Sequence, residues 1–233
     1  MTDPLPAKAT PITSDDQWHA LRAVNIGSSE VAALFDASPY MTKFMLWHAK
    51  AGNAPLKQPD DERVDWGKHL EPGIANGVAE AMRWNLVARK EYLSSPAVEG
   101  MGCTIDRHIE DHAQGPGIVE CKNVDFIRWK TTWTPTRAPA HIELQLQEQF
   151  AVDRRKTWGA IAALVGGNEL VIYERRPDPK IIAEIEAAVA AFWSDVRAGR
   201  APEPFGDAKE IPTLAALYPA TDDQEVATLD LEA

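Results

Sequence analysis

The segment over residues 115–122 constrains this chain more than any other. It opens with the breakers Gly-Pro-Gly, and the apolar pair Ile-Val follows, which predicts a short strand that ends at Lys122. Because side chains alternate along a strand, Glu120 and Lys122 share one face and Cys121 points to the other.

A second short run, residues 101–106, ends in Asp106 and predicts a strand that pairs with the first through a connection over 107–114. One end of the sheet would then carry two carboxylates and one ammonium. Carboxylate oxygens suit a hard divalent cation, and a lysine beside them can balance charge that develops at a phosphate. The pattern favours metal-assisted phosphodiester hydrolysis. The alternative is solvated surface charge, since 25% of the residues are charged.

Size and composition predict a folded protein without a membrane anchor. The 233 residues are 45% hydrophobic, which suffices for one good core, and no apolar run approaches the length of a membrane span. The first residues lack the apolar stretch of a signal peptide, so we expect a cytoplasmic protein. Cys103 and Cys121 would lie on the two paired strands, and we interpret them as small core residues rather than a disulfide.

The net charge of −11 argues against a nucleic-acid partner. Its distribution weakens that objection. Residues 201–233 hold eight acidic residues and one lysine, so they supply −7 of this charge. Between residues 121 and 160 the balance reverses, with seven basic and four acidic side chains. Charge therefore lowers the rank of a DNA partner without excluding it.

The order of elements predicts an α/β (α+β) fold with a central mixed sheet flanked by helices. We expect a flexible N-terminus over 1–13, a single domain over 14–204 and a loosely held acidic tail over 205–233. The expected helical segments are 14–51 in three pieces, 66–82 interrupted near Pro72, 141–152 and 180–198, and the expected strands are 86–92, 101–106, 117–122, 157–165 and 169–174.

Four further features accompany the two acidic strand ends. They are Trp66-Gly-Lys-His-Leu-Glu71-Pro, Pro139-Ala-His-Ile-Glu-Leu-Gln145-Leu-Gln, Arg22 followed by Ile26-Gly-Ser-Ser29-Glu-Val with Pro39-Tyr40, and Ala191-Phe-Trp. In this order and spacing they resemble the YqaJ-type viral recombinase (lambda exonuclease) family, from about residue 18 to residue 204.

The resemblance implies a PD-(D/E)xK nuclease fold with two divalent ions, usually Mg²⁺, for which Mn²⁺ can substitute. Asp106 would bridge the ions, Glu120 would bind one of them, and the carbonyl of Cys121 would complete its protein ligands. Lys122 would position the attacking water. Two further catalytic residues carried over from the family are Glu71, which would act at the second ion, and Gln145, which would lie near the lysine.

The resemblance also implies that Arg22 and Ser29 hold a 5′-phosphate. A guanidinium binds phosphate bidentately, and Ser29 would lie in the first turn of a helix capped by Ser28, whose free N–H groups attract anions. The alternatives are a surface salt bridge for Arg22 and plain helix capping for Ser29.

Two positions depart from the family pattern. Arg107 follows Asp106 where the family commonly has Pro-Asp-Gly, and Ile142 stands where an aromatic residue is common. Other candidates rank lower: Trp129 and Trp133 suit core packing better than base stacking, and the histidines 69, 108, 112 and 141 are read as surface or helix-face residues.

We therefore expect a Mg²⁺-dependent exonuclease that degrades duplex DNA ends 5′→3′. The resemblance further implies a single-strand annealing protein as partner and a homo-oligomeric ring around DNA. Two alternatives stay open: an endonuclease or RNA-acting nuclease of the same fold, and an inactive DNA-end or protein-binding module.

Overall fold

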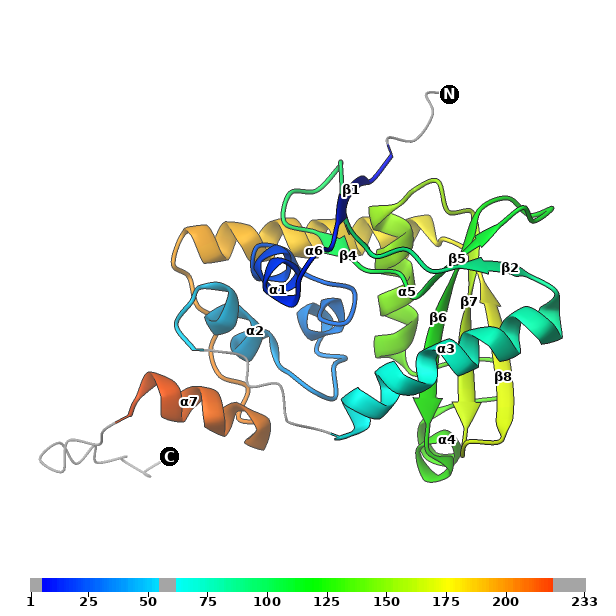
Figure 1. Cartoon of the computed structure of the whole chain (residues 1–233). Coiled ribbons are helices and arrows are strands. Elements are labelled where there is room, and N and C mark those ends of the chain that lie inside the picture. Colours follow the sequence, from blue (N-terminus) through cyan, green and yellow to red (C-terminus); the bar gives the residue numbers. More distant parts are fainter. Residues whose placement is uncertain (1–5, 55–61, 220–233) are drawn as a thin grey trace, which may run out of the picture.

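The computed structural model describes residues 6–54 and 62–219 of the chain. The helices and strands bring segments that are distant in the sequence together (Figure 1). In chain order the elements are β1 (Lys8–Pro11), α1 (Asp15–Ala23), the 3-10 helix η1 (Val31–Phe35), α2 (Lys43–Lys50), α3 (Glu62–Met82), β2 (Asn85–Val87), β3 (Glu91–Ser94), β4 (Gly102–Cys103), β5 (Arg107–Glu110), β6 (Gly117–Val124), α4 (Phe126–Thr132), α5 (Ala140–Val152), β7 (Trp158–Val165), β8 (Glu169–Arg175), α6 (Pro179–Arg197), the 3-10 helix η2 (Ala208–Glu210) and α7 (Ile211–Leu217).

The larger sheet has the strand order β2-β5-β6-β7-β8. Its central pair, β6 and β7, is parallel, and the other neighbours are antiparallel. The crossover from β6 to β7 runs through α4 and α5, as a parallel connection requires. Both central strands are buried along most of their length, which explains their nearly continuous apolar sequence.

The two faces of this sheet have different covers. Helix α3 crosses one face, where Val119 and Cys121 join its apolar cluster, and α5 packs on the other, where Ile118 joins the main core. Figure 1 shows α5 between the sheet and the helices α1 and α2. Because side chains alternate along β6, Glu120 and Lys122 lie on the α5 side. The fold thus aims both residues at α5.

The predicted pairing of residues 101–106 with β6 is wrong. Only Gly102–Cys103 is extended there, and it pairs with β3 in a separate sheet of order β1-β3-β4. A Cβ on Gly102 would lie 2.7 Å from the Leu93 carbonyl oxygen, so the glycine permits this close approach. The antiparallel neighbour of β6 is β5, which lies within the expected connection. Both cysteines are free and buried, but they belong to different sheets.

The expected strand 86–92 is divided into β2 and β3, which belong to different sheets, and three further boundaries also differ from the prediction. Residues 8–11 of the expected flexible lead-in form β1 and pair with β3. Helix α3 continues through Pro72, which is exposed, so water can solvate the Lys68 carbonyl that loses its partner. The tail is helical as far as Leu217, because Glu210 is buried and accepts hydrogen bonds from Thr42 Oγ1, Phe205 N and Gly206 N. Residues 220–233 of the predicted tail lie outside the described residues.

Gly100 joins three distant segments. Its carbonyl accepts hydrogen bonds from Ile26 N at 2.7 Å and from Trp193 Nε1 at 2.7 Å. Its φ is +79°, and a Cβ there would lie 2.2 Å from the Trp193 indole nitrogen. Only glycine fits both the backbone conformation and the contact.

Gly100→Ala should lower the free energy of unfolding by about 3 kcal/mol, because a positive φ and a clash with the indole act together. Urea unfolding monitored by tryptophan fluorescence measures this loss. Gly167→Ala is the matched control, since its φ is also +79° but no atom lies within 4 Å of the added Cβ. That control should cost about 1 kcal/mol. Equal losses in both variants would show that the Trp193 contact contributes nothing.

Candidate active site

The carboxylate of Glu120 is the hub of the predicted site. It is buried on β6, and its Oε1 accepts hydrogen bonds from Lys122 Nζ at 2.6 Å and Gln145 Nε2 at 2.6 Å. Its Oε2 accepts a hydrogen bond from Gln149 Nε2 at 2.7 Å. Gln145 also accepts a hydrogen bond from Lys122 at 3.0 Å. Strand and helix therefore hold this carboxylate from both sides.

Gln149 was missed by the sequence analysis, which followed the Gln-x-Gln spacing to Gln147. In the structure Gln147 points away and bonds the backbone of Arg176 and Asp178. Gln145 and Gln149 are four residues apart and share one helix face, whereas residues two apart do not. Helical periodicity over α5 was the pattern that could have identified Gln149.

Asp106 lies beside Glu120, immediately before β5. Its Oδ2 accepts a hydrogen bond from the backbone N–H of Cys121 at 2.8 Å. In an extended strand the N–H and C=O of one residue point to the same side, so the Cys121 carbonyl also faces Asp106. Asp106, Glu120, Lys122 and the Cys121 backbone are thus brought together, although through a strand pairing other than the predicted one.

Burial and mutual repulsion dominate the electrostatics of these groups. Burial, and then the nearby Glu120 carboxylate, raise the pKa of Asp106 well above its usual range. Burial lowers the pKa of Lys122, but the carboxylates of Glu120 and Asp106 outweigh it and raise that pKa overall. Lys122 is therefore held as an ammonium, and the two carboxylates favour a cation between them.

Glu71 reaches this cluster through Arg107. The guanidinium of Arg107 forms an ion pair with Glu71 from α3 and donates a hydrogen bond to the Asp106 carbonyl. The charge on Glu71 also contributes to the raised pKa of Asp106. Arg107 occupies the position where the resembling family commonly has glycine, and this departure was the indication that the local contacts would differ.

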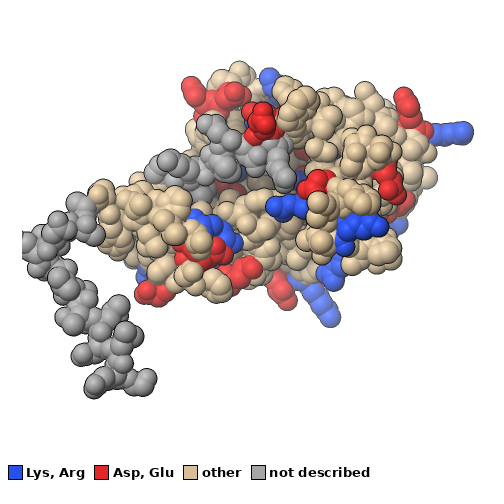
Figure 2. Space-filling model, turned by 90° about the horizontal axis from the view of Figure 1, so that it is seen from below, with Lys and Arg blue, Asp and Glu red and all other residues tan. Residues whose placement is uncertain are grey.

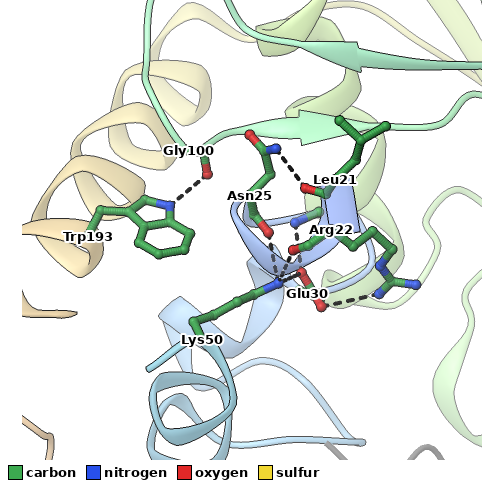
Figure 3. A network of polar contacts seen from close by, with 8 residues as sticks. Leu21, Arg22, Asn25, Glu30, Lys50, Gly100 and Trp193 are labelled. Atoms are coloured by element: carbon green, nitrogen blue, oxygen red, sulfur yellow. Dashed lines mark hydrogen bonds and ion pairs between the residues drawn. The ribbon is translucent and has the colours of Figure 1, made fainter. Parts of the chain in front are cut away.

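Arg22, near the end of α1, belongs to a separate polar network with Glu30 and Lys50 (Figure 3). Its Nη2 donates to Glu30 Oε1 at 3.2 Å, and its guanidinium lies 4.6 Å from the centroid of the Trp18 ring. The buried Lys50 ammonium donates to Glu30 Oε2 at 2.9 Å and to two carbonyl oxygens, those of Arg22 at 2.7 Å and Asn25 at 2.8 Å. The salt bridge considered for Arg22 is present, and it fixes the guanidinium to a rigid support.

The predicted helix start at Ser28 and Ser29 is wrong. The helix here is the 3-10 helix η1, which begins at Val31 after Glu30. Ser29 is exposed in the turn before it. The carboxylate of Glu30 accepts the Gly27 N–H at 2.8 Å in the preceding turn, and η1 has no side-chain cap. Within the described residues, neither Arg22 nor Ser29 bonds directly to the Glu120 cluster.

Of the histidines predicted to be surface or helix-face residues, His108 differs, whereas His141 does lie on a helix. His108 is buried on β5, and His141 is half-buried at the start of α5, one turn before Gln145. Burial, and then the charges of Lys122 and Arg128, lower the pKa of His141 to about 4. Trp133 packs in the core against Trp129 and Tyr173, as predicted. His141 therefore stays neutral beside the site at physiological pH.

A pocket of about 520 Å³ lies on the opposite side of α5 from the carboxylates. Its lining includes Glu143, Gln147 and Arg175, whose polar groups already bond one another or the backbone. The pocket takes no part in the predicted site.

Seen from below, the half of the molecule that holds the sheet carries several Lys and Arg side chains (Figure 2).

The donor set suits a divalent cation in part. Asp106 and Glu120 offer carboxylate oxygens and Cys121 a carbonyl oxygen, all hard donors of the kind that Mg²⁺ prefers, and Mg²⁺ usually keeps several waters. Among the described residues, no group of three or more His, Cys, Asp or Glu side chains could hold a metal ion. Any ion here would therefore need waters or substrate oxygens besides these protein ligands.

Another buried carboxyl group, that of Glu148, lies on the core side of α5. It is fully buried, and neither of its oxygens has a hydrogen-bond partner among the described residues. Burial, and then the charge of Glu30, raise the pKa of Glu148 well above its usual value. The folded protein therefore holds this side chain in its neutral form.

Glu148→Gln should stabilise the fold increasingly as the pH rises. The folded state binds the proton and the unfolded state releases it above its ordinary pKa near 4.5. Above that pKa, this proton lowers the free energy of unfolding of the wild type by up to about 1.4 kcal/mol per pH unit. The amide of the variant does not titrate and causes no such loss. Urea unfolding at pH 5, 6.5 and 8 should show a growing difference between the two proteins. The exposed Glu184→Gln should show no such trend, and parallel pH profiles for Glu148→Gln and wild type would contradict a neutral Glu148.

Known proteins give independent comparisons. Residues 17–157 match the family described as the YqaJ-like viral recombinase domain. The uncharacterized protein YqaJ of Bacillus subtilis (strain 168) is 27% identical over 220 residues, which cover 93% of this chain and 67% of that protein.

Solved structures confirm the predicted fold class. LHK-Exo, described as an alkaline exonuclease from Laribacter hongkongensis, matches with a TM-score of 0.62 at 18% identity over 79% of this chain and 94% of that chain. A structure of LHK-Exo in complex with dAMP matches equally well. In the described part of this chain, no helix is both long and apolar enough to span a membrane.

Proposed function

Because this chain belongs to the YqaJ-like viral recombinase domain family, we propose that it is a Mg²⁺-dependent deoxyribonuclease that degrades duplex DNA from its ends, 5′→3′. The single observation that carries the proposal is the contact of the Lys122 ammonium with the buried Glu120 carboxylate, next to Asp106. A buried charged cluster of this kind adds little to stability, and groups with perturbed pKa values concentrate at functional sites. The description of LHK-Exo as an exonuclease supports the same reaction class.

In the proposed reaction each residue has a separate task. Lys122, held as an ammonium, orients the attacking water and stabilises the charge that builds on the phosphate. Gln145 and Gln149 fix the orientation of the Glu120 carboxylate. Arg107 holds Glu71 close to Asp106, so that Glu71 acts on the outer side of the cluster.

Asp106, Glu120 and the Cys121 carbonyl would hold the divalent ion, with Glu71 assigned to a second one. When bound, such ions lower the pKa of water and neutralise charge on phosphate oxygens. Removal of the ions with a chelator should abolish cleavage, and Mg²⁺ or Mn²⁺ should restore it.

We place the 5′-phosphate of the substrate at Arg22, next to the exposed Ser29. The ion pair with Glu30 and the ring of Trp18 hold the guanidinium in one orientation, which lowers the entropy lost on binding an anion. Ends so produced would carry single-stranded tails for an annealing protein. A homo-oligomeric ring belongs to the same proposal.

Lys122→Ala should lower cleavage of an end-labelled linear duplex by at least about 10³-fold, because the charge on the phosphate loses its stabiliser. Gel analysis with Mg²⁺, Mn²⁺ and a chelator measures this. A wild-type protein that cleaves no DNA with either ion would contradict the enzymatic proposal and favour an inactive binding module. Cleavage of closed circular DNA or RNA at the same rate would favour the endonuclease or RNA alternatives.

Gln149→Ala should reduce kcat about 10- to 100-fold, because Glu120 Oε2 loses the hydrogen-bond donor that it has among the described residues. Gln147→Ala is the matched control two residues earlier on the same helix, since its side chain points away. The control should keep wild-type kcat. Equal kcat losses for the two variants would show that the effect is on α5 as a whole.

Arg22→Ala should abolish the preference for a 5′-phosphorylated duplex over a 5′-hydroxyl duplex. Wild type should prefer the phosphate by about 10- to 100-fold, as expected for a bidentate contact to a charged group. Initial rates on the two duplexes measure the ratio. The exposed Arg200→Ala should leave the ratio unchanged, and an unchanged ratio in Arg22→Ala would remove this residue from end recognition.

A further inference from the structure

Lys50, the last residue of α2, lies against the end of α1 that carries Arg22 (Figure 3). Its side chain is only 4% exposed, and its Nζ donates hydrogen bonds to Glu30 Oε2 at 2.9 Å and to the carbonyl oxygens of Arg22 at 2.7 Å and Asn25 at 2.8 Å. Burial lowers the pKa of Lys50, and the Glu30 carboxylate opposes that shift. Three donated hydrogen bonds require the ammonium form, since a neutral amine has only two N–H groups. A buried positive charge therefore lies under this end of α1.

The Glu30 carboxylate is shared between two cations. Its Oε2 pairs with Lys50, and its Oε1 pairs with Arg22 Nη2 at 3.2 Å. The carboxyl group of Glu148 interacts electrostatically with Glu30, but it is held neutral and adds no negative charge. One carboxylate against two cations leaves an excess of one positive charge. Because the side chain of Arg22 is 18% exposed and that of Lys50 only 4%, the excess charge reaches solvent at the guanidinium.

Without Lys50 the same group would carry no net charge. Arg22 and Glu30 alone form a neutral ion pair, so the carboxylate would repel an incoming anion nearly as strongly as the guanidinium attracts it. Lys50 also binds the carbonyl oxygens at the end of α1, where a cation interacts favourably with the helix dipole. Lys50 thus fixes the backbone that carries Arg22 and cancels the charge of Glu30.

We propose that Lys50 is a positioning residue for recognition of the substrate end, because it lets Arg22 present a net positive charge to the terminal phosphate. The proposal rests on the proposed 5′-phosphate site at Arg22 and names the group that gives this site its charge. Lys50 does not touch the substrate, since its three N–H groups are already donated within the protein. The excess charge favours the doubly charged phosphate monoester of a DNA end over the singly charged diesters within a strand.

The test compares two labelled duplexes that differ only in a 5′-phosphate or a 5′-hydroxyl group. Fluorescence anisotropy in a chelator gives the ratio of their Kd values, and Lys50→Met should lower this ratio about tenfold, because one unit charge is lost close to the phosphate. In steady-state cleavage with Mg²⁺, the loss should fall on KM for the phosphorylated duplex and not on kcat. Lys43→Met is the matched control. Lys43 lies seven residues earlier on the same helix and forms no ion pair within residues 6–54 and 62–219, so this variant should keep the wild-type ratio.

A second substitution separates the charge effect from packing. Lys50→Met/Glu30→Gln again leaves an excess of one positive charge, so its Kd ratio should return to within about threefold of the wild-type ratio. A role in packing alone predicts a further loss in this double variant. Glu30→Gln alone removes the shared counter-charge and should raise the ratio about threefold. It tests the charge balance even if urea unfolding shows that Lys50→Met does not fold.

The proposal is overturned if folded Lys50→Met keeps the wild-type ratio, if the double variant is no better than Lys50→Met, or if Glu30→Gln lowers the ratio. These results are distinct from failure of the proposed function. A wild type whose ratio is lost in Arg22→Ala but kept in Lys50→Met overturns the role of Lys50 alone. A wild type that binds both duplexes equally overturns the phosphate site and Lys50 together. A wild type that shows the expected ratios but cleaves nothing with Mg²⁺ or Mn²⁺ upholds Lys50 and ends the nuclease proposal.

Discussion

The site depends on holding the carboxyl group of Glu120 in the buried centre of a mixed β-sheet. Such a group is unfavourable in an apolar interior unless donors surround it. Here one donor comes from the next residue on the same face of β6, and two come from one face of α5. Strand, crossover helix and site are therefore one unit. A shift of β6 by one residue would point the carboxylate at α3 and its apolar cluster.

Periodicity predicted much of this unit. The β6 strand, the β7–β8 hairpin, and the helices α5 and α6 all lie where alternation, turn residues and three- to four-residue spacing placed them. These patterns are local, and each is reinforced by tertiary packing in the same register. The predicted grouping of Asp106 with Glu120 and Lys122 holds because Asp106 is at the start of the strand that does pair with β6.

The sequence does not show which of several similar strands or side chains make contact in the folded protein. Two short runs precede β6; β5 pairs with it, and β4 pairs with β3 instead, where Gly102 permits a close approach. Gln149 and Gln147 are the same residue type, and only their phase on the helix separates them. Glu30 and Lys50 are twenty residues apart, and nothing local indicates that they meet under Arg22. Non-local contacts of this kind need the assembled fold.

The buried carboxylate of Glu210 links the C-terminal segment to Thr42, the N-cap of α2. A shortened protein that ended at residue 204, where the family resemblance stops, would lack this acceptor. The hydroxyl of Thr42 would then face a vacated cavity, and the bend that carries Tyr40 would lose its lower support. Truncation there would therefore loosen the turn before α2, whereas the contacts of the Asp106 and Glu120 carboxylates lie elsewhere in the fold.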